Sequence, residues 1–212
     1  MSAGHAAQVT GGACATLRQL LIADGTAGHP YALALGAPRV PSRDLIDAVH
    51  ALCTVHGQHP DLLAIAAHQS EQADAHAWLA HAAAAFAEER AALAQLVAAA
   101  GPLPSTPGQA ETSAALTAER HALEMLARSE RTGVALGAAA ALVGDWHAVR
   151  LVLARAADRF GVTLPFTAMG SPDALLAGSP ERAVAFGAQQ LLAQHRGLWS
   201  LLEARSSARG HH

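Results

Sequence analysis

Three polar side chains are spaced four residues apart in the stretch AAHQSEQADAHAWL, which covers residues 66–79 of the chain. His68, Gln72 and His76 fall on the line where a core helix normally carries leucines. Imidazole and amide groups at such positions are costly to bury unless they are hydrogen-bonded or bound to a ligand. The spacing therefore predicts an internal polar site on this helix.

Carboxylates and a further imidazole fall on the apolar faces of two other predicted helices. Glu119 and Glu130 lie in line with leucines of one helix, and His195 lies near the middle of the apolar face of the last helix. Two physical arrangements satisfy such groups. They can pair with one another, or they can bind a metal, because imidazole and carboxylate suit iron, manganese or zinc and bundles build such sites from facing helices.

Each of these residues also has a structural interpretation. The two histidines and Gln72 could form a polar core layer that is closed by side-chain hydrogen bonds. Glu130 lies beside Arg128 and Arg131, where a surface ion pair would explain it. Haem binding is a third interpretation, in which an axial ligand comes from one of three histidines: His68, His76 or His195.

The elements that must position these side chains are all predicted to be helices. Apolar periodicity, together with Gly and Pro at the ends, predicts helices over residues 13–24, 43–56, 60–100, 111–142, 145–160 and 180–205, with one helical turn near 172–177. The clearest loop is GPLPSTPGQ at 101–109. Gly133 and Gly137 are predicted to let another helix approach closely.

Long helices joined by short loops predict an all-α fold, an up-down antiparallel helical bundle with a four-helix core and an N-terminal helical extension. Residues 1–40 are predicted to form the N-terminal helix and a Gly/Pro-rich connection. The bundle domain is predicted over residues 41–206, and residues 207–212 are predicted to be a disordered tail. Roughly a quarter of the 212 residues are Ala, which favours closely packed helices.

The composition excludes several classes of function. All 14 basic residues are Arg, and both Schiff-base chemistry and a P-loop need Lys. A net charge of −3 gives no electrostatic footprint for nucleic acid, so we expect no nucleic-acid partner.

The cellular setting is also predicted from the sequence. Cys14 and Cys53 are expected to be free thiols, and no signal peptide or membrane span is expected, so we predict a cytoplasmic protein with no membrane partner. Weakly charged Ala-rich surfaces are compatible with a homodimer.

Long helix pairs with inward Glu and His resemble the ferritin-like superfamily over roughly residues 60–205. Its defining Glu-x-x-His motif is absent, and the chain carries the reverse order at His68-x-x-Glu71 and His121-x-x-Glu124. The resemblance implies a bundle that binds two metal ions and activates oxygen.

The leading hypothesis is accordingly a ferritin-like bundle with a buried His/Glu site, a metal-dependent oxidoreductase of the di-iron type. Iron or another divalent transition metal would be the cofactor, and Gln72 would bind beside it. The predicted metal ligands are His68, His76, Glu119, Glu130 and His195. The alternative is a non-enzymatic helical scaffold or small-ligand-binding protein that has no cofactor and whose core histidines are structural.

Overall fold

A computed structural model of the chain describes residues 12–103 and 108–210, and these residues contain helices and no strand, which confirms the predicted all-α class. The elements, including one 3-10 turn named η1, have the following bounds: α1 Gly12–Asp24, η1 Thr26–Gly28, α2 Pro30–Leu35, α3 Ser42–His56, α4 Leu62–Gln69, α5 Ala73–Ala100, α6 Gln109–Ala127, α7 Val134–Phe160, α8 Asp173–Ala177 and α9 Glu181–Gly210. Part of the predicted 101–109 loop, residues 104–107, lies outside the described residues.

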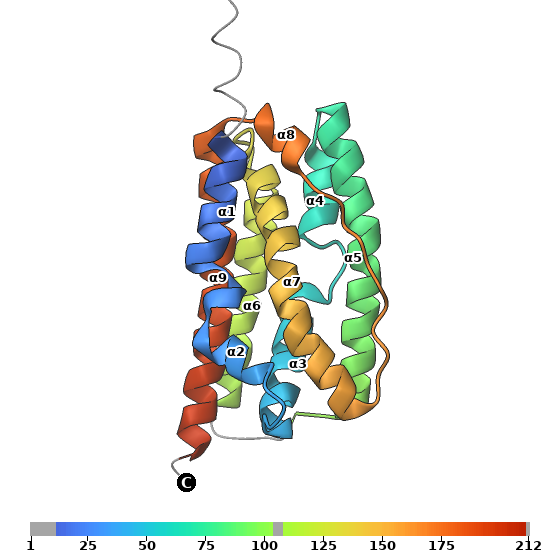
Figure 1. The fold of residues 1–212 in the computed structure, drawn as a ribbon, viewed down its shortest axis with the longest axis vertical. Helices are drawn as coiled ribbons and strands as arrows, with labels where there is room; N and C mark the ends of the chain where they lie inside the picture. Colours follow the sequence, from blue (N-terminus) through green and yellow to red (C-terminus); the bar gives the residue numbers. More distant parts are fainter. Residues whose placement is uncertain (1–11, 104–107, 211–212) are drawn as a thin grey trace, which may run out of the picture.

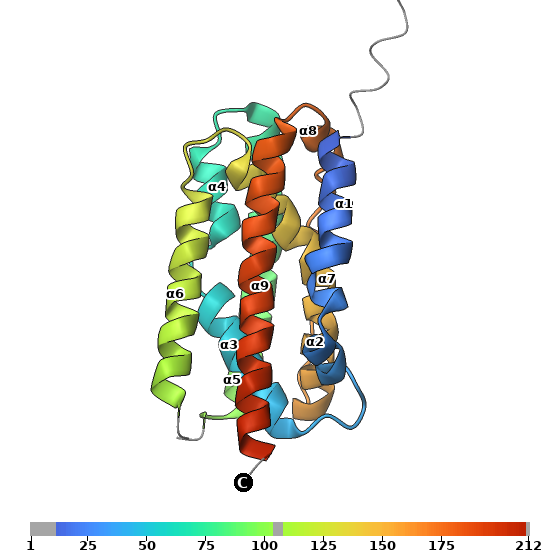
Figure 2. The same ribbon diagram turned by 90° about the vertical axis from the view of Figure 1, so that its left-hand side faces the viewer.

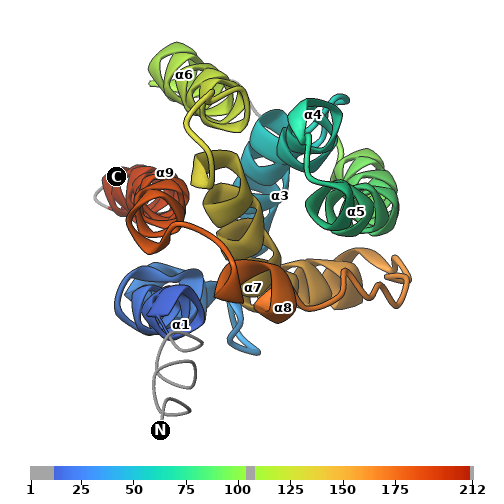
Figure 3. The same cartoon turned by 90° about the horizontal axis from the view of Figure 1, so that it is seen from above.

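Helix α7 forms the centre of the bundle, and Figure 3 shows the other helices arranged around it. Most of its residues from Val134 to Val143 are completely enclosed. Among the described residues, α7 is the one helix that is long and apolar enough to cross a membrane, and 72% of its apolar window is buried. Such burial is also what the central helix of a bundle requires.

The order of helix directions differs from a simple up-down bundle. Helix α6 runs opposite to α5 and α7. It also runs opposite to α9, which lies beside it in Figure 2. The extended segment 161–172 then climbs back along the outside of the bundle, so α9 runs in the same direction as α7 (Figure 1). The strictly antiparallel part of the prediction is therefore wrong for this pair, because the poorly periodic connection is a long crossover.

The helix predicted over 60–100 is two helices, α4 and α5, with extended backbone at Ser70 and Gln72 between them. The Ser70 hydroxyl donates to the Gln72 carbonyl, and His76 Nδ1 lies 2.8 Å from the carbonyl oxygen of Ala67 at the end of α4. Such local side-chain bonds compete with continued helix. His68 before the break, Gln72 in it and His76 after it are all exposed, so their predicted inward orientation is wrong.

The second long helix also breaks at a different place from the one predicted. Helix α6 ends at Ala127, and α7 begins after Gly133, whose φ of 93° suits glycine. The predicted break between residues 142 and 145 does not occur. Gly144 instead lets α1 approach α7, since a Cβ there would lie 2.7 Å from Leu21 Cδ1. Asp145 is therefore an interior residue of α7, whereas the sequence predicts it at the start of a helix.

Helices α7 and α9 contact each other through glycines, as predicted for Gly137. A Cβ at Gly137 would lie 2.1 Å from the carbonyl oxygen of Val184, and one at Gly187 would lie 2.0 Å from that of Val134. Both contacts are with backbone, which cannot move aside as a flexible side chain can. The two glycines therefore set the distance between these helices.

Gly137→Ala is expected to lower the free energy of unfolding by about 1–3 kcal/mol, because the methyl group forces two backbones apart. Gly197→Ala in α9 is the matched control, since a Cβ there meets no atom within 4 Å. It is expected to stabilise by about 0.5–1 kcal/mol, as Ala does over Gly in a helix. Urea unfolding of both variants measures the difference, and equal effects would contradict the assigned contact.

Helix α9 continues to Gly210, beyond the predicted bundle boundary at 206, and residues 211–212 lie outside the described residues. Its last turn is attached to α3 by ion pairs. Arg209 Nη2 lies 2.8 Å from Asp44 Oδ1, and Asp47 Oδ2 pairs with both Arg209 and Arg205. These pairs explain why 207–210 are helical although they were predicted to be disordered.

Candidate functional site

A buried polar network lies where η1, α3, α7 and α9 meet. The carboxylate of Asp145 accepts the backbone N–H of Thr26 at 2.7 Å on Oδ1 and the Thr26 hydroxyl at 2.6 Å on Oδ2. The indole N–H of Trp199 donates to the same hydroxyl oxygen at 2.9 Å. The carboxylate is thus held by η1 from one side.

Two histidines extend this network to α9 and α3. His195 Nδ1 lies 2.6 Å from Asp145 Oδ2, and His195 Nε2 lies 3.2 Å from His56 Nε2. An ionised carboxylate only accepts, so His195 carries a proton on Nδ1. The two Nε2 atoms then share a single hydrogen, which one of them donates to the other. The aromatic rings of Phe86 and Trp146 contact the His56 ring edge-on.

Burial and hydrogen bonding set the protonation of this network. Burial alone would raise the pKa of Asp145, but the bonds from His195 and Thr26 outweigh it and hold that pKa below its usual value. Burial, together with the neighbouring His195, holds the pKa of His56 well below its usual value. The chain Asp145–His195–His56 therefore contains an ionised carboxylate and an uncharged outer imidazole at neutral pH.

An Asp–His pair of this kind activates a nucleophile in many hydrolases. Here the second imidazole occupies the position that a nucleophile would take, and Phe86 and Trp146 enclose it. Neither of the two cavities described below is lined by a member of the network. The geometry joins four elements in the core, and each side chain of the network is buried.

A second buried carboxylate, Glu119 of α6, has no such partners. Its side chain is 8% exposed, and its Oε1 atom forms no hydrogen bond with the described residues. Burial raises its pKa to about 8. Glu119 is therefore mostly protonated at neutral pH, because burial penalises its charged form.

A third buried carboxylate, Glu89 of α5, is paired with Arg150 of α7. The same guanidinium donates to the carbonyl oxygen of Pro165 at 2.7 Å and to the Thr167 hydroxyl at 2.9 Å. The Thr167 hydroxyl also contacts Glu89. This pair attaches the extended segment 161–172 to the bundle, which is a structural role.

The structure does not bring the predicted metal ligands together. Glu119 and His195 are buried, whereas His68, His76 and Glu130 are exposed, and Glu130 lies in the loop between α6 and α7. Over residues 12–103 and 108–210, no group of three or more His, Cys, Asp or Glu side chains is placed to hold one metal ion. His195 instead contacts Asp145 and His56, neither of which is among the predicted ligands.

A cavity of about 480 Å³ lies at the end of the bundle where α5, α7 and α9 begin. The break between α4 and α5 forms one side of it, the loop between α6 and α7 another, and Ser179 and Pro180 contribute a third. Its floor is apolar and buried, and consists of Ala66, Ala75, Leu79 and Leu136. Its rim is polar and exposed, and includes Gln72 and Glu130 from the predicted site.

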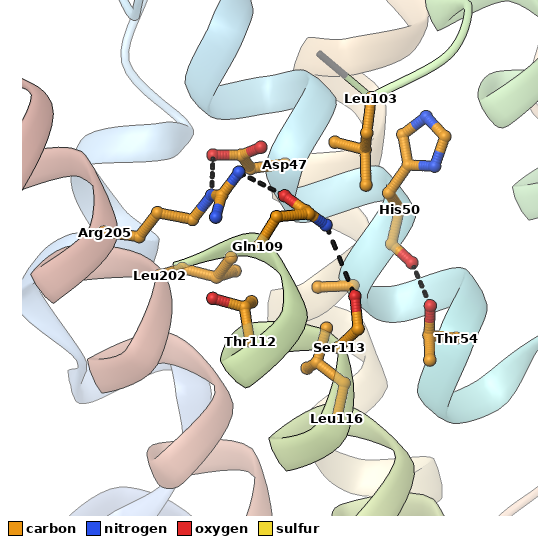
Figure 4. Close-up of a pocket in the computed structure, with 11 residues that line it drawn as sticks. Asp47, His50, Thr54, Leu103, Gln109, Thr112, Ser113, Leu116, Leu202 and Arg205 are labelled. Carbon is orange, nitrogen blue, oxygen red and sulfur yellow. Dashed lines mark hydrogen bonds and ion pairs between the residues drawn. The ribbon is translucent and has the colours of Figure 1, made fainter. Parts of the chain in front are cut away.

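A second cavity near the opposite end holds about 30 Å³ (Figure 4). Gln109 lies between Arg205, which donates to its side-chain oxygen, and Ser113, which lies 3.4 Å from its nitrogen. Arg205 also pairs with Asp47 of α3. This volume suits about one water molecule, so the cavity at the other end is the candidate ligand site.

Sequence reasoning missed the central members of the polar network. The sequence predicts Asp145 at the start of the 145–160 helix and Thr26 in the N-terminal region of residues 1–40, with no buried role for either. His56 ends the predicted 43–56 helix at helical spacing from its apolar residues, and this spacing is the available signal, because an imidazole that extends a row of buried residues needs a buried partner. Its partner, His195, was predicted to lie in the core, and this is confirmed by its burial.

Fold and geometry together define an all-helical protein with a closed polar network in its core and one ligand-sized cavity among those described. The chain belongs to a family of unknown function, DUF6975, whose family model matches residues 21–210. No curated protein and no solved structure matches the chain. The match is to no ferritin-like family, so the predicted resemblance to that superfamily is not confirmed.

Proposed function

We propose that this protein binds a small molecule in the cavity at the start of α5, α7 and α9, and that its core histidines are structural. The observation that carries the proposal is the cavity itself, with about 480 Å³ above a buried apolar floor and inside a polar rim. Ligand sites typically have this size and this division between apolar lining and a few polar groups.

The side chains around the cavity explain why space remains there. Three of the lining residues are alanines on three different helices: Ala66, Ala75 and Ala135. Two of the surrounding chain connections break a helix at this end, so no side chain of the next turn fills the gap. Close packing normally removes such voids, because each one forfeits van der Waals contacts.

The leading sequence hypothesis, a metal-dependent oxidoreductase, gains no support from this geometry. That hypothesis needs five ligands close together. Glu119 and His195 are each buried, whereas His68, His76 and Glu130 are exposed. These three residues lie in separate segments, His68 in α4, His76 in α5 and Glu130 in the loop between α6 and α7, so each would have to move independently. The small-ligand alternative needs no such movement, since its cavity is already formed.

Ala75→Phe tests the proposal by filling the cavity from its floor. Ala75 is 4% exposed and lines the cavity, so a phenyl ring there occupies the ligand's space. Native mass spectrometry of protein purified without denaturation is expected to detect a bound small molecule in the wild type and none in this variant. Ala84→Phe on an exposed face of the same helix is the control and is expected to keep the ligand.

Loss of the ligand in both variants, or retention in both, would place any bound molecule outside the cavity. Circular dichroism at the purification temperature separates lost binding from lost folding in Ala75→Phe. If this variant is unfolded, Ala75→Leu provides a smaller filling of the same space. A wild type that carries no ligand and binds no small probe would contradict the proposed function.

A further inference from the structure

The chemistry of the rim narrows the class of ligand. Two arginines line the cavity, Arg128 at the end of α6 and Arg131 in the following loop. Neither side chain forms an ion pair or hydrogen bond with another described residue. By contrast, the described arginines at the core boundary are paired with carboxylates, as Arg90 is with Asp61 and Arg150 with Glu89.

Backbone donors lie on the same side of the cavity as the arginines. Ala135 and Leu136 line it from the first turn of α7, where N–H groups have no acceptor within the helix. No side chain caps α7, and no acidic residue lies in its first turn. These fixed donors favour a negative group at this position, and they strengthen the contribution of the two guanidinium groups.

Two carboxylates, Glu71 and Glu130, also line the cavity, and they favour a cation. These two carboxylates are exposed on the rim, as are Arg128 and Arg131, so water weakens the field of all four groups alike. The first turn of α7, which also lines the cavity at Ala135 and Leu136, adds uncapped backbone donors and no carboxylate. Charge on the cavity rim is thus balanced, and the uncapped first turn of α7 shifts this balance in favour of an anion.

On the basis of the binding function proposed above, we propose that the ligand is a small amphiphilic carboxylic acid. Its carboxylate contacts Arg128, Arg131 and the first turn of α7, and its apolar part lies on the alanine and leucine floor. If each non-hydrogen atom of the ligand occupies about 30 Å³, as a water molecule does in the liquid, the cavity of about 480 Å³ holds roughly 15 such atoms. Planar guanidinium groups bind carboxylates in bidentate fashion, which orients such a ligand.

Three probes of one chain length test the class of ligand: octanoate, octylamine and octanol. Isothermal titration calorimetry at low ionic strength is expected to show that octanoate binds at least about tenfold more tightly than either of the others. In the double variant Arg128→Gln/Arg131→Gln, octanoate is expected to bind no better than octanol. Arg39→Gln, an exposed arginine far from the cavity in the sequence, is the control and should keep the preference.

The outcomes separate this inference from the proposed function. Equal binding of octanol and octanoate, or tighter binding of octylamine, overturns the carboxylate assignment. If octanol or octylamine binds the wild type in this way and Ala75→Phe abolishes the binding, the wild-type cavity binds small molecules and the proposed function is supported. Octanoate binding that persists unchanged in the double variant also overturns the assignment, and binding that persists in Ala75→Phe counts against the cavity itself.

Discussion

Replacement of Glu119 by Gln is expected to stabilise the protein by about 3 kcal/mol at pH 7 and to change little at pH 4. Burial raises the pKa of this carboxyl group to about 8, whereas its usual value is 4.5. Between these two values the folded protein holds a proton that the unfolded chain has released. Stability therefore falls as pH rises through this window, at about 1.36 kcal/mol for each unit.

A neutral amide of the same shape removes this dependence, because it cannot ionise in either state. Urea unfolding at pH 4 and pH 7 measures the effect, with Glu88→Gln as the control on an exposed face of α5. The control is expected to stay within about 0.5 kcal/mol of wild type at both values. An equal gain from Glu119→Gln at both pH values would show that the cause is packing, and a loss at pH 7 would show that Glu119 is ionised.

The helical class of the fold could be predicted because it depends on composition and local periodicity. Abundant Ala and few β-branched residues favour helix wherever the chain is placed. The close approach at Gly137 was predicted for a similar reason, since a glycine on an apolar face removes a side chain from a helix contact. Such inferences use only a few neighbouring residues.

The site could not be predicted in the same way, because an inward orientation is propagated along a helix at about 100° per residue. Three non-helical residues between α4 and α5 are enough to displace the assigned face, which is why His76 was placed wrongly. Glu130 fell in an unpredicted loop, and an expected break at Gly144 hid the role of Asp145. His195 lies well inside one continuous helix, and its burial was predicted correctly.

Asp145→Ala is expected to lower the free energy of unfolding by about 3–5 kcal/mol, because it leaves buried donors without an acceptor. The Thr26 N–H, the Thr26 hydroxyl and His195 Nδ1 all donate to this carboxylate. Asp158→Ala, on the exposed side of the same helix, removes a surface pair with Arg155 and is expected to cost at most about 1 kcal/mol. Urea unfolding at pH 7 compares the two variants.

The same pair of variants tests whether the core network is structural. If it is, Asp145→Ala loses stability, but at a temperature where it is folded it binds the small molecule as the wild type does, since no member of the network lines the cavity. Loss of binding in a folded Asp145→Ala protein would assign the network to function. A loss of stability below about 1 kcal/mol would mean that water replaces the carboxylate, which the enclosure of Asp145 and His195 by the core opposes.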